Sequence, residues 1–448
     1  RQMCIRDRSS EAKDRPARLS ADAIADALER YHHTPEQVAV IEAPLEPLLV
    51  VAGAGSGKTD TMASRVVWLV ANGLVRPQEI LGLTFTRKAA GELAERVNQR
   101  LRMLEASGLW SPPDDPDGTP SLGESPTIST YNAYAGRIVG EHGLRLGIEP
   151  DARMLSEAAA WQFAHEVASG WDGDMSQVTV KLPSVTAAVL ATAGELSEHR
   201  RSVDELRAYY DSLLGSLDAI PFAPRKRSLG DAGKALTAKA KGHQQILPLI
   251  ERYQSLKKDR SALDFSDQIA FAAELADRFP AIGAIERARY RMVLLDEFQD
   301  TSSAQIAFLA AVFAAGETQQ RPGVVAVGDP HQSIFGWRGA SATTLSAFRR
   351  SFALPGSDLT PVASLATSWR NDAAVLDAAN VTAAPLNRAS RVPVATLRPR
   401  PDAGPGALAA ARYLTEADEA RAVAQWVAER RRPLRPGEAP RTASVLCR

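Results

Sequence analysis

The sequence predicts an α/β fold in which helices cover a parallel β-sheet. Short, continuous apolar runs, which suit strands buried on both faces, alternate with longer helical stretches. Polar or glycine-rich segments directly follow several of these runs, as expected where functional residues gather at the carboxyl ends of parallel strands. The expected strands are 48–52, 80–85, 127–129, 292–295 and 324–327, and the expected helices are 58–71, 87–104, 133–142 and 303–314.

The first expected strand leads into a glycine-rich loop, Ala-Gly-Ala-Gly-Ser-Gly-Lys-Thr, at 52–59. Glycines let backbone N–H groups turn onto phosphate oxygens, Lys58 can reach the β- and γ-phosphates, and the Thr59 hydroxyl can bind Mg²⁺. A glycine-rich loop alone is often only a turn, but Gly-Lys-Thr after a buried strand predicts a nucleotide site. Its predicted members are Ala52, Gly53, Ala54, Gly55, Ser56, Gly57, Lys58 and Thr59.

A later apolar run, 292–295, ends in Asp-Glu-Phe-Gln-Asp. Asp296 is suited to hold Mg²⁺, directly or through water, and Glu297 to orient and deprotonate an attacking water. Taken alone, the segment fits a solvated acidic turn better. Together with the loop at Lys58 it predicts the metal ligand and the general base of a nucleotide site.

The strand expected at 324–327 runs into Gly-Asp-Pro-His-Gln and then an aromatic loop. Gln332 can hydrogen-bond a γ-phosphate or the attacking water. Phe335 and Trp337, beside Arg338, can form a stacking platform for unpaired bases. The spacing equally allows both aromatics to be core residues beneath a loop.

Several segments, taken in order, resemble successive motifs of the UvrD/Rep family, superfamily 1 DNA helicases that move 3′ to 5′ on single strands. They are Leu-Thr-Phe-Thr-Arg-Lys-Ala-Ala at 83–90, Leu-Asp-Phe-Ser-Asp at 263–267, the acidic segment at 296–301 and the segment 327–340. The resemblance covers roughly residues 30–448 and implies RecA-like motor domains.

The resemblance also implies roles for single residues. Gln37 looks like the family's adenine-reading glutamine. In Ser-Trp-Arg-Asn at 368–371, Trp369 would stack on adenine and Arg370 would reach the γ-phosphate. The implied DNA contacts are Thr84, Phe85, Lys88, Phe335, Trp337 and Arg338.

The residues at 58–73, 335–339 and 368–371 are also similar to those of the actinobacterial AdnB-type motor subunit. In that group a nuclease domain follows the motor, which works beside an AdnA-type partner on broken DNA ends. The sequence departs from the wider family at three places. Asp60 replaces an arginine, Thr-Tyr-Asn-Ala at 130–133 replaces Thr-Phe-His-Ser, and Phe298 replaces a tyrosine.

We expect residues 1–20 to be a disordered or non-native leader. A first RecA-like motor domain is expected at 21–143 and 263–360, interrupted by a DNA-binding helical subdomain at 144–262. Residues 361–448 would begin a second RecA-like domain, with a helix at 416–432 and a strand at 443–446, and the family's later motifs are missing. Basic residues at 225–227 and 234–241 can track phosphates or form a solvated helix face.

Composition narrows the class of protein. The chain has 448 residues, with 53 basic and 53 acidic side chains, so a histone-like coat of positive charge is excluded. Cys4 and Cys447 provide neither a disulfide framework nor zinc spacing. No apolar run approaches membrane-spanning length and the first residues lack a hydrophobic signal core, so we expect a cytoplasmic protein that does not bind membranes.

The function expected is that of the N-terminal part of an ATP-dependent 3′–5′ DNA helicase or translocase. It would use ATP and Mg²⁺ and act on single-stranded DNA and on DNA ends or junctions, in repair or double-strand-break resection. Its catalytic residues would be Lys58, Glu297, Gln332 and Arg370. The alternatives are a stand-alone repair helicase without a nuclease, a nucleotide-gated DNA-binding scaffold subunit, and a small-molecule kinase, which would not need the aromatic loop.

Overall fold

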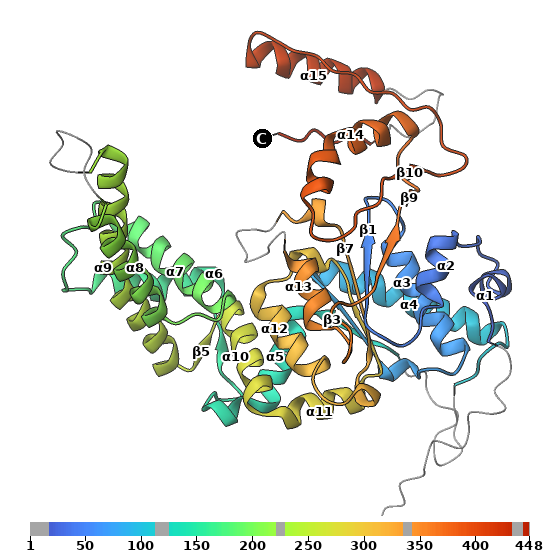
Figure 1. The fold of residues 1–448 in the computed structure, drawn as a ribbon, viewed down its shortest axis with the longest axis horizontal. Helices are drawn as coiled ribbons and strands as arrows, with labels where there is room; N and C mark the ends of the chain where they lie inside the picture. Colours follow the sequence, from blue (N-terminus) through green and yellow to red (C-terminus); the bar gives the residue numbers. More distant parts are fainter. Residues whose placement is uncertain (1–17, 113–124, 221–228, 335–342, 432–441, 448) are drawn as a thin grey trace, which may run out of the picture.

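The structure is a computed structural model that describes residues 18–112, 125–220, 229–334, 343–431 and 442–447. It confirms the predicted α/β fold. Six parallel strands form one sheet in the order β3-β2-β6-β7-β1-β8 (Figure 1). The strands are β1 Leu48–Ala52, β2 Ile80–Thr84, β3 Thr127–Thr130, β6 Met292–Leu295, β7 Gly323–Gly328 and β8 Val362–Leu365.

The central strands are buried because helices cover both faces of the sheet. In β1, Leu49 and Val51 join one core cluster, whereas Val50 and Ala52 join the other, since successive side chains of a strand point to opposite faces. One face packs on α1 Ala21–Ala27, α2 Pro35–Ile41, α3 Lys58–Ala71 and α4 Arg87–Ala106. The other packs on α5 Tyr131–His142, α10 Phe265–Arg278, α11 Pro280–Arg289, α12 Ser303–Phe313 and α13 Thr344–Ser351.

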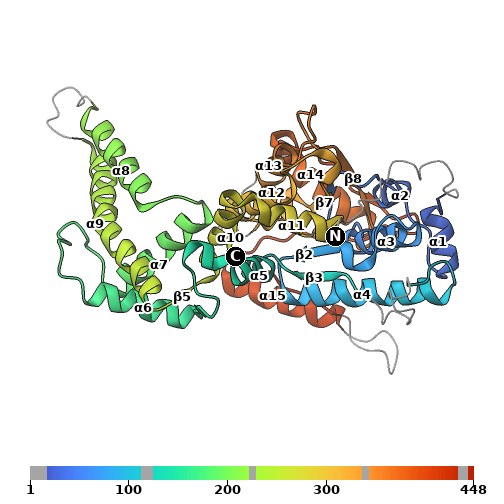
Figure 2. The ribbon, with the colours of Figure 1, turned by 90° about the horizontal axis from the view of Figure 1, so that it is seen from below.

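Four helices form a separate group with its own core cluster, set apart from the sheet in both views (Figures 1 and 2). They are α6 Glu157–Ser169, α7 Leu182–Glu198, α8 Val203–Asp218 and α9 Asp231–Asp259. The chain enters this group through β4 Arg153–Met154 and leaves it through β5 Ala262–Leu263. These two short strands pair in parallel and form what we call the neck.

The second motor domain was predicted to begin at residue 361, but the strand that follows this residue belongs to the first sheet. Strand β8 pairs with β1, so the first sheet continues to Leu365. The Leu49 N–H donates to the Pro361 carbonyl at 3.0 Å, and the Gly53 N–H donates to the Leu365 carbonyl at 3.3 Å. Without β8, the β1 strand would be an edge with unpaired backbone groups.

The remaining segments are α14 Ala373–Ala389, α15 Glu416–Arg430, and the short strands β9 Thr367–Ser368 and β10 Arg398–Pro399. Helix α15 has no buried residue, and its Trp426 is half exposed. The strand predicted at 443–446 is wrong: residues 442–447 form no strand and belong to none of the sheets of the described residues. Within the described ranges, no helix is both long and apolar enough to cross a bilayer.

Candidate active site

The phosphate loop connects β1 to α3 and depends on two left-handed glycines. Gly55 and Gly57 have φ angles of 76° and 80°, a region that side chains rarely adopt. At Gly57 a Cβ atom would also lie 2.9 Å from Gln37 Nε2. The Ser56 hydroxyl donates to the Gly53 carbonyl at 2.8 Å and tightens the loop. Helix α3 begins at Lys58, so its unpaired N–H groups and positive dipole end face the loop.

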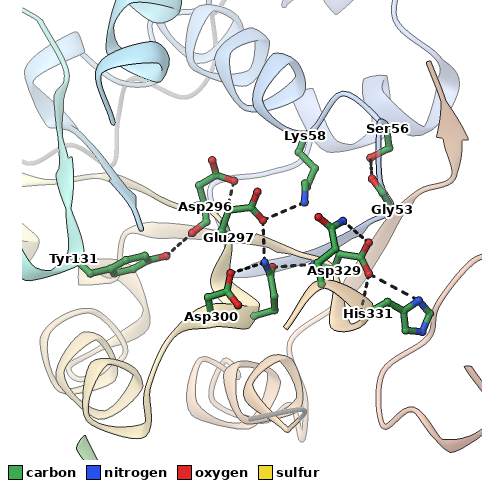
Figure 3. A network of polar contacts seen from close by, with 11 residues as sticks. Gly53, Ser56, Lys58, Tyr131, Asp296, Glu297, Asp300, Asp329 and His331 are labelled. Atoms are coloured by element: carbon green, nitrogen blue, oxygen red, sulfur yellow. Dashed lines mark hydrogen bonds and ion pairs between the residues drawn. The ribbon is translucent and has the colours of Figure 1, made fainter. Parts of the chain in front are cut away.

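Lys58 meets Glu297 at the carboxyl ends of the sheet strands (Figure 3). The distance from Lys58 Nζ to Glu297 Oε2 is 3.1 Å, and the lysine side chain is 11% exposed. The fold therefore brings together two residues that the sequence assigned to the same reaction from separate motifs. Thr59 follows Lys58 in the first turn of α3 and is half-buried.

The two acidic residues follow β6 in a strained backbone turn. Glu297 has φ 46° and ψ 43°, the left-handed region, which is uncommon for a residue other than glycine. The Asp296 N–H donates to the Leu83 carbonyl at 2.8 Å, which extends the pairing of β6 with β2. The Glu297 N–H donates to Asp296 Oδ1 at 3.0 Å.

Asp296 is 5% exposed, and its pKa is raised to about 6, first by burial and then by the neighbouring Glu297 charge. Burial and Glu297 also raise the pKa of Asp300 to about 6. Within the described part of the chain, Asp296 forms no ion pair and no cluster of three metal-binding side chains exists. A buried carboxylate after β6, together with a threonine hydroxyl at the start of α3, suits Mg²⁺, which commonly takes one or two carboxylates plus phosphate oxygens and water.

Gln299 joins the acidic turn to the neighbouring strand. Its Nε2 donates to Glu297 Oε2 at 2.9 Å and to Asp300 Oδ2 at 3.1 Å, while its Oε1 accepts the Asp329 N–H at 3.0 Å. This residue is not among those predicted from the sequence. Its position between two carboxylates, with an amide that can both donate and accept, was a signal that could have found it.

Gln332 follows β7, and Asp329 holds it in place. Gln332 Nε2 donates to Asp329 Oδ2 at 2.6 Å, and the other carboxylate oxygen accepts the His331 N–H at 2.9 Å. Asp329 is 6% exposed and is likewise not among the residues predicted from the sequence. Gln332 follows β7 and Glu297 follows the parallel neighbour β6, so both lie at the carboxyl edge of the sheet.

Two segments that lie far apart in the sequence, at Gln37 and at 369–370, reach the phosphate loop. Gln37 Oε1 accepts the Thr34 N–H at 3.0 Å in a capping box, while Nε2 lies 3.5 Å from the Ser56 carbonyl. The Trp369 N–H donates to the Gly55 carbonyl at 2.9 Å. A Cβ atom added to Gly55 would lie 2.7 Å from Arg370 Cβ, so the backbone at Arg370 also lies against the loop.

Residues 33–353 match the UvrD/REP helicase N-terminal domain. The chain belongs to this helicase family. It is 29% identical over 323 residues to a probable DNA helicase II homolog of Rickettsia felis, an alignment covering 71% of this chain and 40% of that protein. It is 25% identical over 345 residues to the ATP-dependent DNA helicase PcrA of Leuconostoc citreum, covering 77% of this chain and 38% of the relative. The PcrA of Staphylococcus aureus strain Mu50 is 25% identical over 352 residues, covering 78% and 39%. The chain thus spans about two fifths of the length of these relatives.

Asp60, where the UvrD/Rep family often has arginine, pairs with three arginines. Arg30 lies 3.2 Å and Arg96 lies 3.7 Å from its Oδ1, and Arg100 makes the closest contact. Arg100 is 3% exposed and also donates to the Ser64 hydroxyl at 2.8 Å. The acidic residue therefore fits a buried arginine supplied by α4.

A cleft of about 980 Å³ separates the sheet from the helical group in this helicase chain. Its lining combines the aromatic side chains Phe85, Tyr131 and Phe265 with polar groups that include Thr130, Asn132 and Glu198. Of the other predicted DNA contacts, Thr84 is buried, with its hydroxyl donating to the Thr86 carbonyl at 3.1 Å. Lys88 is exposed and 3.7 Å from Glu92. Phe335, Trp337 and Arg338 lie outside the described residues.

Proposed function

We propose that the protein is an ATP-driven DNA translocase and helicase. The observation that carries the proposal is the 3.1 Å contact between Lys58 of the phosphate loop and Glu297 after β6. A cation for the phosphates and a carboxylate for water activation then lie within one side-chain length of each other. Phosphoryl transfer depends mainly on positioning and charge stabilisation, which this arrangement provides.

In the proposed reaction, backbone N–H groups of residues 53–59 surround the ATP phosphates, and Lys58 neutralises their charge. Thr59 and Asp296 would hold Mg²⁺, which neutralises charge developing on the phosphate oxygens. Gln37 and Trp369, which both approach the loop at Gly57, would contact the adenine. This part of the proposal is supported by the loop geometry and by the buried carboxylate of Asp296.

Glu297 would orient the attacking water and accept its proton. The amide of Gln299 donates to one Glu297 oxygen, which leaves the other available for water. Gln332 would hydrogen-bond the γ-phosphate or the water, and Arg370 would stabilise the charge that develops on the phosphate. The backbone contact of Arg370 with the loop supports this role.

We further propose that single-stranded DNA occupies the cleft lined by Phe85 and moves 3′ to 5′ as the two halves of the protein close on ATP and reopen. Thr84, Lys88 and the aromatic loop with Phe335, Trp337 and Arg338 would contact the strand. The names of the relatives, which are DNA helicases, support DNA as the substrate. The direction rests on the family resemblance alone.

The finer proposal is an AdnB-type subunit that acts on DNA ends in double-strand-break resection with an AdnA-type partner. A stand-alone repair helicase is the alternative within the class, and a scaffold with an inactive motor is the alternative outside it. Digestion of linear duplex DNA by the full-length protein with its partner would favour the first. ATP-dependent unwinding without digestion would favour the second, and DNA binding without hydrolysis the third.

The test of the main proposal is ATP turnover by the full-length protein and two variants. Lys58→Ala should weaken both nucleotide binding and turnover. Glu297→Gln should keep nucleotide affinity but reduce kcat by about a hundredfold or more, because the amide cannot accept the proton of water. Near-normal turnover in Glu297→Gln would remove this residue as the base.

A further inference from the structure

Tyr131 at the start of α5 reaches the turn that carries the proposed base. Its hydroxyl donates to the Asp296 carbonyl at 2.9 Å, and the ring is 3% exposed (Figure 3). Burial raises the pKa of this hydroxyl well above its usual range, so the group stays protonated and remains a donor. The carbonyl that it contacts belongs to the peptide unit joining Asp296 to Glu297.

That peptide unit is held at both ends. Its N–H, from Glu297, donates to Asp296 Oδ1 at 3.0 Å, and its carbonyl accepts from Tyr131. Rotation of this unit would change φ of Glu297, which stands at 46°. A non-glycine residue keeps a left-handed conformation only where its surroundings determine it, because the extended or helical regions are lower in free energy. The Tyr131 hydroxyl is one of the two groups that oppose the rotation.

Tyr131 is itself fixed by its neighbours. The preceding Thr130 caps α5, with its hydroxyl accepting the Ala133 N–H at 3.2 Å. The following Asn132 accepts from Gln305 Nε2 at 3.2 Å, and Gln305 belongs to the capping box of α12. The start of α5 is therefore anchored to α12, and the tyrosine hydroxyl is presented from a rigid element.

We propose that Tyr131 is a positioning residue that locks the 296–297 peptide and so keeps the Glu297 carboxylate beside Lys58. The inference rests on the proposed role of Glu297 in ATP hydrolysis. A phenylalanine at this position, as in the wider family pattern, could not make the bond. Tyr131 also lines the cleft beside Thr130, so its hydrogen bond to Asp296 connects the cleft wall to the turn that carries Glu297.

The test is Tyr131→Phe in the full-length protein, which removes one oxygen atom and keeps the ring. The expected result is a fall in kcat of about three- to tenfold with KM for ATP unchanged, because one hydrogen bond that orients the base is lost. Tyr134→Phe is the matched control. It removes another buried hydroxyl of α5, which donates to Glu286 at 2.8 Å far from the phosphate loop, and should leave kcat unchanged.

A second comparison separates positioning from general weakening of the fold. In the Glu297→Gln background, Tyr131→Phe should change the residual turnover by less than about twofold, because residues that act through one group are not additive. A loss of the same size in both backgrounds, a change confined to KM, or wild-type kcat in Tyr131→Phe would overturn the inference. Absence of ATP turnover in the wild-type protein would instead overturn the proposed function.

Discussion

At the scale of single residues, the active-site candidates are held in states that cost stability. Asp296 is buried beside the like charge of Glu297, and Glu297 has left-handed backbone angles. Neither arrangement benefits folding by itself. In the function proposed above, a divalent cation and phosphates would supply compensating charge, and the site would trade stability for function.

The loss of folding stability caused by the Asp296 charge can be measured with Asp296→Asn, which keeps an oxygen acceptor for the Glu297 N–H. The pKa of Asp296 is about 6 in the folded protein and 3.8 in the unfolded chain. The free energy of unfolding therefore falls as pH rises from 3.8 through 6. At pH 7.5 without nucleotide, the variant should therefore be more stable than wild type by roughly 1–3 kcal/mol. Thermal or urea unfolding would measure this difference.

The same variant has an internal control in the pH dependence. The stability difference should shrink progressively as pH falls below 6, where wild-type Asp296 becomes protonated and neutral. Stabilisation by ATP with Mg²⁺ should also be weaker in the variant. A variant that is less stable than wild type at pH 7.5 would contradict the interpretation of Asp296 as a strained charge.

The sequence predicted those site residues whose roles follow from local pattern. Asp296 directly follows β6, Lys58 ends the glycine-rich loop that follows β1, and both residue types match the chemistry of their segments. Gln299, Asp329 and Tyr131 were not predicted as site residues. The contact of Gln299 with Asp329 joins two strand ends, and that of Tyr131 with Asp296 joins a helix to a strand end, so both depend on tertiary placement. Tyr131 acts on a peptide 165 residues away, which no spacing within its own segment indicates.

At the scale of elements, two contacts fix α3, the helix that begins at the phosphate loop. Its first turn is tied to α4 through Asp60 and Arg100. Its middle is tied to the end of α2 through Arg65, which is fully buried and donates to four carbonyls between Val40 and Pro44 at 2.8–3.0 Å. Burial lowers the pKa of Arg65 to about 10, so it remains charged at neutral pH.

Asp60→Asn should destabilise the protein, because Arg100 is 3% exposed and would keep its charge without a carboxylate partner. The expected loss is roughly 1–3 kcal/mol. Arg96→Ala is the control, since Arg96 is 43% exposed and lies 3.7 Å from Asp60. It should cost less than about 1 kcal/mol. Equal losses in the two variants, measured by urea unfolding, would show that burial of Arg100 does not set the strength of this contact.

His33, just before α2, should make stability depend on pH. It lies 2.8 Å from the Ser64 hydroxyl, and burial lowers its pKa below 6.5. The unfolded chain therefore takes up the proton first as pH falls, and the folded protein loses stability below about pH 6.5. His33→Gln should show a shallower loss between pH 7 and 5.5 than wild type in urea unfolding. Identical slopes would mean that His33 does not contribute.

At the scale of the whole molecule, the described residues contain three core clusters, two on the faces of the sheet and one in α6–α9. The two sheet cores share the same strands, so they should open together. The helical group shares no strand with them and contacts the sheet layer mainly through α7 against α10 and α12. It should therefore behave as a separate cooperative unit.

Hydrogen exchange can test this division. Amides of α6–α9 should exchange through a common opening with a lower free energy than amides of β1, β2, β6 and β7. Added single-stranded DNA should slow exchange at the cleft around Phe85 and Thr130 if the strand binds there. Exchange of the helical group and the sheet with a single shared free energy would contradict the division.

The sheet was predictable because β1, β2, β6 and β7 are continuous apolar runs, and burial on both faces leaves a clear pattern. Strand β8 was assigned to a second domain because its residues, Val-Ala-Ser-Leu, show no such run and its pairing with β1 depends on tertiary placement. The strand predicted at 443–446 failed for the opposite reason. Its local pattern favours a strand, but residues 442–447 form none.

The neck has a consequence for how such a protein can change over generations. Because Arg153–Met154 pairs with Ala262–Leu263, the chain departs and returns at adjacent points, and the order of strands in the sheet is independent of what lies between. The neck is thus a position at which the inserted helical group can be lengthened, shortened or exchanged without altering the sheet. The requirement on any replacement is narrow: one helix face that covers α10 and α12 as α7 does.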